Sequence, residues 1–535
     1  MLTTQTIPAS PSPATTLPMS IRVYNTLSKT KEPFEPVVPG RVGIYLCGPT
    51  VYKPSHIGHM VGPLIFDAVK RYLVYCGYEV TWVVNITDVD DKLIAESNVR
   101  GIPMAQLAEE MTADYMDNLA AMGIDTVDHF PRATATIDEI ISLTQSLIDK
   151  GFAYQADGDV YFDVARDPEY GKLSNRSIES LHGDGGEMAG RKRAAADFAL
   201  WKSAKPGEPS WDSPWGQGRP GWHIECSAMS RKLLGETFDI HGGGLDLVFP
   251  HHENEIAQSE CAHGKAQAKY WMHNGLMQSS SEIGKVGGRN TRELAAGDQA
   301  AQESGKLGKS KGASAFRDLL KRFAGETIRF FVLSTHYRRP IDYSDERITE
   351  VEKGLTTFYR FFQRYERVTG ESFYRIEAAA NRTAGDVLAA DPVLAADIAA
   401  CRQRFLAAMD DDFNTGGAIG DLFELVRGLN KFVDSENLES TGKSNAAAVA
   451  ALKAGARTLR ELALMLGLFR QPPPAAASGA DEGLTSQLLE LLIALRNESR
   501  KAKNFALADQ IRDRLAALGV TLEDRPDGTG WSIQK

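Results

Sequence analysis

The feature that most constrains the fold is a strand, loop, helix and strand near the start of the chain. Residues 42–47 are a short β-branched and apolar run that closes on Gly48-Pro49, which predicts a strand followed by a turn. Apolar side chains recur at helical spacing over residues 63–76, with Pro63 near the first turn, and residues 79–84 predict a second strand. A βαβ unit implies a parallel sheet, so we predict an α/β fold.

The loop between the first strand and its helix contains His56-Ile-Gly-His59. The amino end of a helix presents unpaired N–H groups and positive potential, which attract anions. The glycine lets a nucleotide approach the backbone, and the imidazoles can donate hydrogen bonds to a phosphate whose charge grows in a transition state. Two unrelated histidines in a polar loop are the alternative, but the strand–loop–helix context favours a phosphate site at His56 and His59.

Length and composition limit the class of protein. A chain of 535 residues is too long for one core and should form several domains. Its 43% hydrophobic and 24% charged residues are typical of globular proteins, and the absence of a bilayer-spanning apolar run predicts no membrane partner. Five scattered cysteines do not suit a secreted disulfide framework and favour a cytoplasmic location. The net charge of −10 excludes a generally basic coat, but local basic patches can still bind RNA.

Four further residues suit a metal ion. His251 and Glu255 lie four apart, so on a helix they share one face. Cys226 precedes them, and Cys47 ends the first predicted strand. Two thiolates, an imidazole and a carboxylate make a plausible tetrahedral zinc set. A solvated His–Glu pair on a helix surface is the alternative that the residues alone leave open.

Several sequence blocks stand out along the chain. They are Cys47–Tyr52 with His56–His59, Asn85–Lys92, Gly221–Cys226, His241–Asp246, Phe249–Glu255 and Met409–Thr415. Taken together and in this order, from Ile21 nearly to the C-terminus, these blocks resemble the class I aminoacyl-tRNA synthetases in their cysteine-specific form. The resemblance implies an enzyme that activates L-cysteine with ATP and Mg²⁺ and transfers it to the 3′ end of tRNA-Cys.

The resemblance also implies roles for individual residues. One Zn²⁺ would be held by Cys47, Cys226, His251 and Glu255, and would select cysteine by binding its sulfur. Shape alone separates cysteine from serine by only about 10- to 200-fold, whereas a thiolate is much the better zinc ligand. The substrate cysteine is expected near three residues, Thr50, Thr87 and Trp222. ATP is expected along His56 and His59, with its ribose near Asp246.

A lysine-rich loop forms the second expected signature. The best match is Lys306-Leu-Gly-Lys-Ser310, in which Lys306 and Lys309 are the predicted catalytic residues and Lys309 also binds ATP. Ammonium groups on a flexible loop can clamp the leaving pyrophosphate. The family pattern is Lys-Met-Ser-Lys-Ser, so Leu307 and Gly308 depart from it. We interpret residues 278–305, rich in Gly, Ser and Ala, as a mobile insertion before the loop.

The predicted domain order follows the family. Residues 1–20 carry no charged side chain and four prolines, which predicts a disordered tail rather than a secretory signal. The remaining predicted parts are a Rossmann-type catalytic domain in two halves (21–149 and 240–344), an inserted connective domain between them (150–239), an α-helical anticodon-binding domain (345–470), a linker (471–483) and a small C-terminal anticodon-reading unit (484–535). In that unit Phe505 would stack on an unpaired base, and Asp509 and Asp524 could accept hydrogen bonds from base edges.

Two rival functions stay open from the sequence. A paralogue that ligates cysteine to an amino sugar in thiol biosynthesis shares the zinc and nucleotide motifs but lacks an anticodon-reading tail, so residues 484–535 oppose it. A catalytically decayed zinc-containing tRNA-binding paralogue is suggested by Leu307 and Gly308, and opposed by the intact two-histidine motif and by Lys309. We expect the protein to be a monomer.

Overall fold

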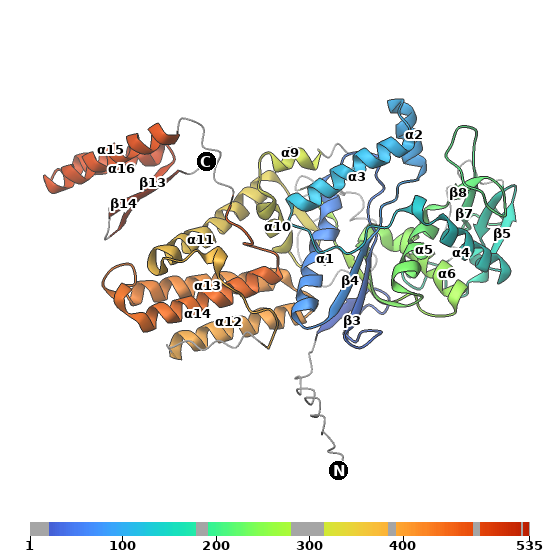
Figure 1. Cartoon of the computed structure of the whole chain (residues 1–535), viewed down its shortest axis with the longest axis horizontal. Helices are drawn as coiled ribbons and strands as arrows, with labels where there is room; N and C mark the ends of the chain where they lie inside the picture. The colour runs from blue at the N-terminus through green and yellow to red at the C-terminus, as the bar shows by residue number, and fades with distance from the viewer. Residues whose placement is uncertain are drawn as a thin grey trace, which may run out of the picture.

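The computed structural model describes residues 21–177, 191–279, 315–383, 392–473, 482–525 and 528–533. The predicted tail at residues 1–20 lies outside the described residues, as do Lys306 and Lys309 and all but the first two positions of the predicted insertion at 278–305. Figure 1 shows a sheet at the centre, a smaller α/β region on the right and long helices on the left.

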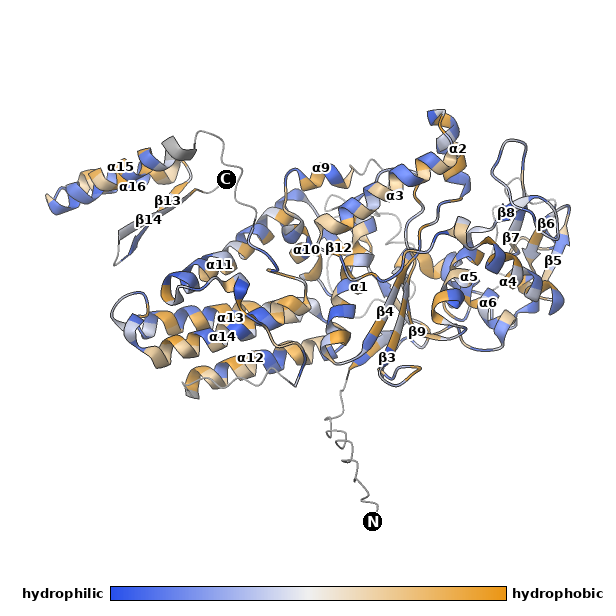
Figure 2. Ribbon diagram, viewed as in Figure 1, coloured by the Kyte–Doolittle hydropathy of each residue, from blue (hydrophilic) through white to orange (hydrophobic). Residues whose placement is uncertain are grey.

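The centre of the molecule is a parallel sheet with strand order β10-β9-β3-β4. These strands are β3 (Arg41–Leu46), β4 (Glu79–Val84), β9 (Phe238–Gly244) and β10 (Ala268–Asn274). Their side chains are mostly buried, as parallel strands covered on both faces require, and orange stretches mark apolar residues of β3 and β4 in Figure 2. The predicted α/β class is confirmed. Because β4 and β9 flank β3 on opposite sides, the strand order reverses at β3, and such a point forms a ligand crevice at the carboxyl ends of the strands.

Helix α1 (Ile57–Tyr75) connects β3 to β4 and begins earlier than predicted. His56 caps the helix, so Pro63 lies inside it rather than in its first turn. Proline has no N–H and therefore removes one intrahelical hydrogen bond at this point. Most side chains of α1 are buried, which compensates for the lost bond by packing.

The chain between β4 and β9 builds a second layer of structure. It contains α2 (Asp91–Arg100), α3 (Met104–Ala121), α4 (Ile137–Asp149) and α5 (Trp222–Leu234). An antiparallel sheet is formed by β5 (Ala153–Ala156), β6 (Asp159–Phe162), β7 (Phe198–Ser203) and β8 (Gly218–Pro220). Its hydrophobic core joins Leu143, Phe162 and Trp201 to Ile224, so this antiparallel sheet packs directly on α5, which carries part of the candidate site.

Further short elements frame the parallel sheet. They are β1 (Arg22–Asn25), β2 (Thr30–Pro33), α6 (Glu253–His263), β11 (Met277–Ser279), α9 (Phe316–Leu320), α10 (Gly325–Leu333) and β12 (Ile341–Tyr343). β1 pairs with β2 in antiparallel fashion, whereas β11 and β12 pair in parallel.

The helices that follow pack on the sheet domain. They are α11 (Asp345–Thr369), α12 (Pro392–Asp410), α13 (Thr415–Ser435) and α14 (Ala446–Met465). One hydrophobic core includes both Ile44 of the sheet and Leu459 of α14, so the two parts form a single packed body. None of the described helices is long and apolar enough to cross a membrane.

The C-terminal unit follows at the end of the chain (Figure 1), and one pocket between this unit and α11 is lined by Arg367, Arg525 and Trp531. It consists of α15 (Glu482–Lys501), α16 (Phe505–Ala517) and a hairpin of β13 (Val520–Arg525) and β14 (Gly528–Ile533). Leu489, Leu515 and Val520 form its own small core.

Candidate active site

The two-histidine motif forms the amino-terminal cap of α1. His56 Nδ1 accepts a hydrogen bond from the backbone N–H of Gly58 at 3.1 Å, and His59 Nδ1 accepts one from the backbone N–H of His56 at 3.3 Å. The two rings lie 3.8 Å apart at 31°. Because both Nδ1 atoms accept, each neutral ring carries its proton on Nε2. The cap therefore turns both imidazoles into donors at a positive helix end.

The loop after β3 is tied closely to the segment after β4. A Cβ atom on Gly48 would lie 1.8 Å from the carbonyl oxygen of Asn85, so only glycine fits there. Thr50 and Thr87 form an isolated parallel bridge, and the Thr87 hydroxyl donates to Glu225 Oε2 at 3.0 Å. Both threonines predicted to lie near substrate are thus connected to α5, next to Cys226.

The four predicted metal ligands come together from three separate parts of the chain. Cys47 follows β3, Cys226 lies in α5, His251 precedes α6, and Glu255 lies in its first turn. Their ligand atoms all lie within 4.8 Å of one another. Cys47 Sγ is 3.8 Å from Cys226 Sγ and 3.3 Å from Glu255 Oε1, and His251 Nε2 is 3.1 Å from Glu255 Oε1. This group can offer two sulfurs, a nitrogen and an oxygen to one ion.

The charge of this group is set by its members. Burial opposes ionisation of Cys226, but hydrogen bonds from Cys47 and His251 prevail and lower the pKa of Cys226 to about 6. Burial likewise opposes ionisation of Glu255, yet His241 and His251 hold the pKa of that carboxyl well below its usual range. The donor set thus holds a carboxylate and a readily formed thiolate in a buried place, which suits a divalent cation.

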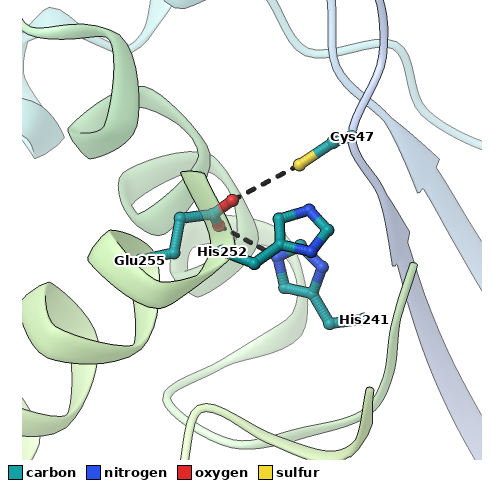
Figure 3. A group of neighbouring side chains, drawn as sticks. All are labelled: Cys47, His241, His252 and Glu255. Carbon is teal, nitrogen blue, oxygen red and sulfur yellow. Dashed lines mark hydrogen bonds and ion pairs between the residues drawn. The ribbon is translucent and has the colours of Figure 1, made fainter. Parts of the chain in front are cut away.

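A second group overlaps the first and is drawn in Figure 3; its members are Cys47, His241, His252 and Glu255, also within 4.8 Å of one another. His241 Nε2 lies 2.9 Å from Glu255 Oε2, and His252 Nδ1 lies 2.7 Å from His273 Nε2. Trp271 stacks on His241 at 4.3 Å. Nδ1 of His241 and Nε2 of His252 are buried and have no hydrogen-bond partner within the described parts of the chain. His241, His252, Trp271 and His273 form the base of the candidate site, in which His241 holds Glu255 directly.

Trp222 and Asp246 lie around this centre. Trp222, at the amino end of α5, is 38% exposed and stacks on His251 at 4.4 Å and 30°. Asp246 lies in a short 3₁₀ turn (Leu245–Leu247) directly after β9. Since β9 neighbours β3, Asp246 and the two-histidine cap stand at the same edge of the sheet. The structure therefore brings the described metal, substrate and nucleotide candidates together at the carboxyl ends of parallel strands.

Three family models match the chain. One described as "tRNA synthetases class I (C) catalytic domain" matches residues 33–286, a DALR domain matches residues 404–470, and a "Cysteinyl-tRNA ligase anticodon binding domain" matches residues 481–531. A cysteine–tRNA ligase of Geobacter metallireducens is 45% identical over 524 residues, which covers 96% of this chain and 100% of that protein. The chain belongs to the cysteine–tRNA ligase family. A second family member, from Syntrophobacter fumaroxidans, is 45% identical over 523 residues, with 96% and 100% coverage.

Solved structures agree on the fold of this ligase family member. Mycobacterium tuberculosis methionyl-tRNA synthetase bound by methionyl-adenylate matches with a TM-score of 0.58 at 15% sequence identity, covering 80% of this chain and 91% of that one. The likeness shows the class I synthetase fold. The predicted Rossmann-type sheet and helical anticodon-binding region are confirmed.

The C-terminal candidates differ in their surroundings. Phe505 opens α16 and is 59% exposed, as a stacking surface must be, and Asp509 pairs with Arg512 at 3.4 Å. Both oxygens of Asp524 accept from Arg496 at 2.7 Å, and those bonds lower the pKa of that carboxyl. Asp524 therefore holds the hairpin to α15 in this ligase family member.

Four residues at the base of the site have no role in the sequence-based prediction: His241, His252, Trp271 and His273. His241 and His252 lie inside recognised blocks, His241–Asp246 and Phe249–Glu255, which was a usable signal. Trp271 and His273 lie in β10 and carried no such signal.

Proposed function

We propose that the protein is a cysteine–tRNA ligase that forms cysteinyl-adenylate from L-cysteine and ATP and transfers the cysteine to the 3′ end of tRNA-Cys. The observation that carries the proposal is the meeting of a two-histidine helix cap and a Cys–Cys–His–Glu group at one edge of a parallel sheet. Membership of the cysteine–tRNA ligase family supports it.

We assign one Zn²⁺ to Cys47, Cys226, His251 and Glu255. The fit rests on their mixed sulfur, nitrogen and oxygen donors within 4.8 Å, and on the ease with which Cys226 ionises. The other group exchanges both Cys226 and His251 for histidines, and its His241 and His252 are engaged with Glu255 and His273. When bound, zinc supplies a Lewis acid that prefers sulfur to a hydroxyl oxygen.

The chain's own residues provide positioning and charge stabilisation. The Nε2–H groups of His56 and His59 would donate to the ATP phosphates as negative charge develops on them. Asp246 would accept hydrogen bonds from the ribose hydroxyls of ATP. Trp222 would cover the substrate cysteine beside His251. The substrate carboxylate attacks the α-phosphate directly, so no general base is needed.

Other parts of the proposal follow the family. Lys306 and Lys309 would clamp the leaving pyrophosphate, and Mg²⁺ would accompany ATP. Residues 21–149 and 240–344 would form the catalytic domain around the inserted residues 150–239, and residues 345–470 and 484–535 would hold the tRNA. We infer a cytoplasmic monomer. Neither rival function is favoured, because a cysteinyl-tRNA ligase anticodon-binding model matches residues 481–531.

The test replaces Cys226 by serine, with Cys261→Ser as the matched control because Cys261 belongs to neither metal group. The Cys226→Ser protein should lose zinc, keep ATP binding and lose at least about 100-fold in cysteine affinity, while its preference for cysteine over serine falls toward the factor set by shape. The control should keep its metal and charge tRNA-Cys normally. Cobalt-substituted wild type should change its visible spectrum on adding cysteine. A spectrum unmoved by saturating cysteine would exclude direct coordination, and failure to charge tRNA-Cys would reject the function itself.

A further inference from the structure

The block Met409–Thr415 has no part in the site described so far, yet its three aspartates reach three different neighbours. Asp410 accepts from Tyr72 of α1 at 2.6 Å, and Asp411 pairs with Lys31 at the surface at 2.7 Å. Asp412 is completely buried between α12 and α13. A buried carboxylate must be hydrogen-bonded and charge-paired to be stable. The contacts of Asp412 therefore indicate what it holds.

The backbone at this point is unusual. Asp412 has φ of 65° and the following Phe413 has φ of 49°, two consecutive non-glycine residues in the left-handed region. Asp tolerates that region, whereas a bulky aromatic residue occupies it only when its surroundings require it. Phe413 is 1% exposed and meets the ring of Tyr72 edge to face at 6.3 Å. The turn is thus held in place by packing against α1, and it directs the Asp412 side chain inward.

One carboxylate oxygen of Asp412 holds β1. Asp412 Oδ1 accepts from the backbone N–H of Tyr24 at 2.8 Å, and the backbone N–H of Asp412 donates to the carbonyl of Arg22 at 2.9 Å. The residues that follow β1 are bonded to β10. Thr26 donates its N–H to the carbonyl of Trp271 at 2.9 Å, and its hydroxyl lies 2.9 Å from His273 Nδ1.

The same carboxylate also holds the chain after α10. Tyr337 donates its hydroxyl to Asp412 Oδ1 at 2.8 Å, and Arg338 Nε donates to Oδ2 at 2.7 Å. The carbonyl of Tyr337 in turn accepts from the N–H of Gly275 at 2.7 Å, directly after β10. A Cβ atom on Gly275 would lie 2.1 Å from the carbonyl oxygen of Arg339, so the two segments touch at the backbone.

Both sets of contacts end on β10, the edge strand of the parallel sheet. Inside the site, β10 presents Trp271 against His241 and His273 against His252. An edge strand has a neighbouring strand on one side only, so contacts on its outer side decide how firmly it is held. Asp412, which lies between two helices, supports those contacts indirectly because it holds the segments of Tyr24 and Tyr337 that bond to β10.

We propose that Asp412 is a positioning residue that holds strand β10, and with it Trp271 and His273, against the base of the cysteine site. It acts through Tyr24 and Tyr337 and touches neither substrate nor metal ligands. The consequence for catalysis rests on the proposed function, whereas the consequence for β10 does not.

The experiment compares Asp412→Asn with Asp411→Asn. Asparagine tolerates the left-handed backbone, but its neutral oxygen accepts more weakly from Tyr24 and Tyr337 than a carboxylate does, and its NH₂ group cannot accept from Arg338. Hydrogen exchange over residues 268–277 should speed up by about tenfold or more in Asp412→Asn, while the amides of β3 and β4 change by less than about twofold. Asp411→Asn should exchange like wild type, because that carboxylate is exposed and pairs only with Lys31 among the described residues.

The kinetic arm uses ATP–pyrophosphate exchange. In Asp412→Asn the KM for cysteine should rise by about fivefold or more, whereas the KM for ATP and the kcat should stay within about threefold of their wild-type values. If Asp412→Asn does not fold, Tyr337→Phe removes one contact only and should give the same pattern more weakly. Exchange that accelerates equally in all strands, or an unchanged β10, overturns the proposal. A wild type that shows no cysteine-dependent exchange rejects the proposed function, and the hydrogen-exchange arm then still decides the role of Asp412.

Discussion

His56 performs two tasks with the two nitrogens of one ring. Nδ1 caps α1 by accepting from Gly58, and this contact places the proton on Nε2. The stacked His59 repeats the arrangement on the backbone of His56. The structural task and the proposed catalytic task can therefore be separated by a residue that caps a helix but has no second donor.

Asn at position 56 is such a residue. Its side-chain oxygen can accept a hydrogen bond from Gly58, so the free energy of unfolding of His56→Asn should lie within about 1 kcal/mol of the wild-type value. Adenylate formation should nevertheless slow by about 100-fold, because the Nε2–H donor is lost. Pyrophosphate exchange and chemical denaturation measure the two effects, with His56→Ala as the variant that loses both. An exchange rate near wild type in His56→Asn would show that the ring serves the helix alone.

His336 lies beside Asp412 and makes the stability of the folded protein depend on pH. Burial, above all, lowers the pKa of His336 to about 4, despite Asp412 at 3.6 Å. An unfolded histidine titrates near 6.5, so below that pH the unfolded state binds more protons and stability falls as the pH drops toward 4. When the pH falls from 7 to 5, the free energy of unfolding should decrease in both proteins, but the decrease should be about 2 kcal/mol smaller in His336→Gln than in wild type. Equal losses in urea titrations would contradict a neutral buried His336.

Among the elements, α13 and α14 show how helix glycines differ by what surrounds them. A Cβ on Gly428 of α13 would meet nothing within 4 Å. A Cβ on Gly455 of α14 would lie 2.3 Å from Leu429 and 3.1 Å from Ile398, both fully buried. The small residue in α14 is therefore needed for close helix packing, whereas the one in α13 is not.

Alanine at each position tests this difference. Gly428→Ala should stabilise the protein by about 0.5–1 kcal/mol, because alanine is the better helix former. Gly455→Ala should destabilise it by about 1–3 kcal/mol, since the extra methyl overpacks the contact with α12 and α13. Denaturant midpoints at constant slope measure both changes. The packing argument fails if the two variants shift in the same direction.

At the scale of the whole molecule, the C-terminal unit has a core of its own, whereas the helices α11–α14 share one core with the parallel sheet. Energetic coupling is expected within a shared core and is weaker across a linker. The unit should therefore contribute to tRNA binding without affecting the chemistry of adenylate formation.

Removing residues 482–535 tests this separation. Cysteine-dependent pyrophosphate exchange should stay within about twofold of wild type, because the candidate site lies in the other body. Charging of tRNA-Cys should fall by about 100-fold or more at low tRNA concentration, as phosphate and base contacts are lost. Phe505→Ala in the full chain is the finer variant and should weaken tRNA binding by about 1–3 kcal/mol. Loss of exchange in the shortened protein would mean that the unit supports the catalytic domain.

Local patterns in the sequence were enough for much of the fold. Apolar spacing over residues 42–84 predicted the βαβ unit, because strand and helix periodicity depend on neighbouring residues alone. The start of α1 was placed too late, since the histidine cap that begins it is a side-chain contact that periodicity does not report. The family followed from the order of short blocks, and the comparisons confirm it.

Only the tertiary structure brought the remaining parts together. Strand pairing places β10 beside β9, and that contact carries Trp271 and His273 to the base of the site. Asp412 bonds to Tyr24 across 388 positions of sequence. No local pattern encodes such a pair, because the energy of a buried carboxylate depends on which distant donors the fold delivers to it. Local patterns were thus enough to predict the βαβ unit and the family, whereas the packing of distant segments selects the buried side chains that support the proposed chemistry.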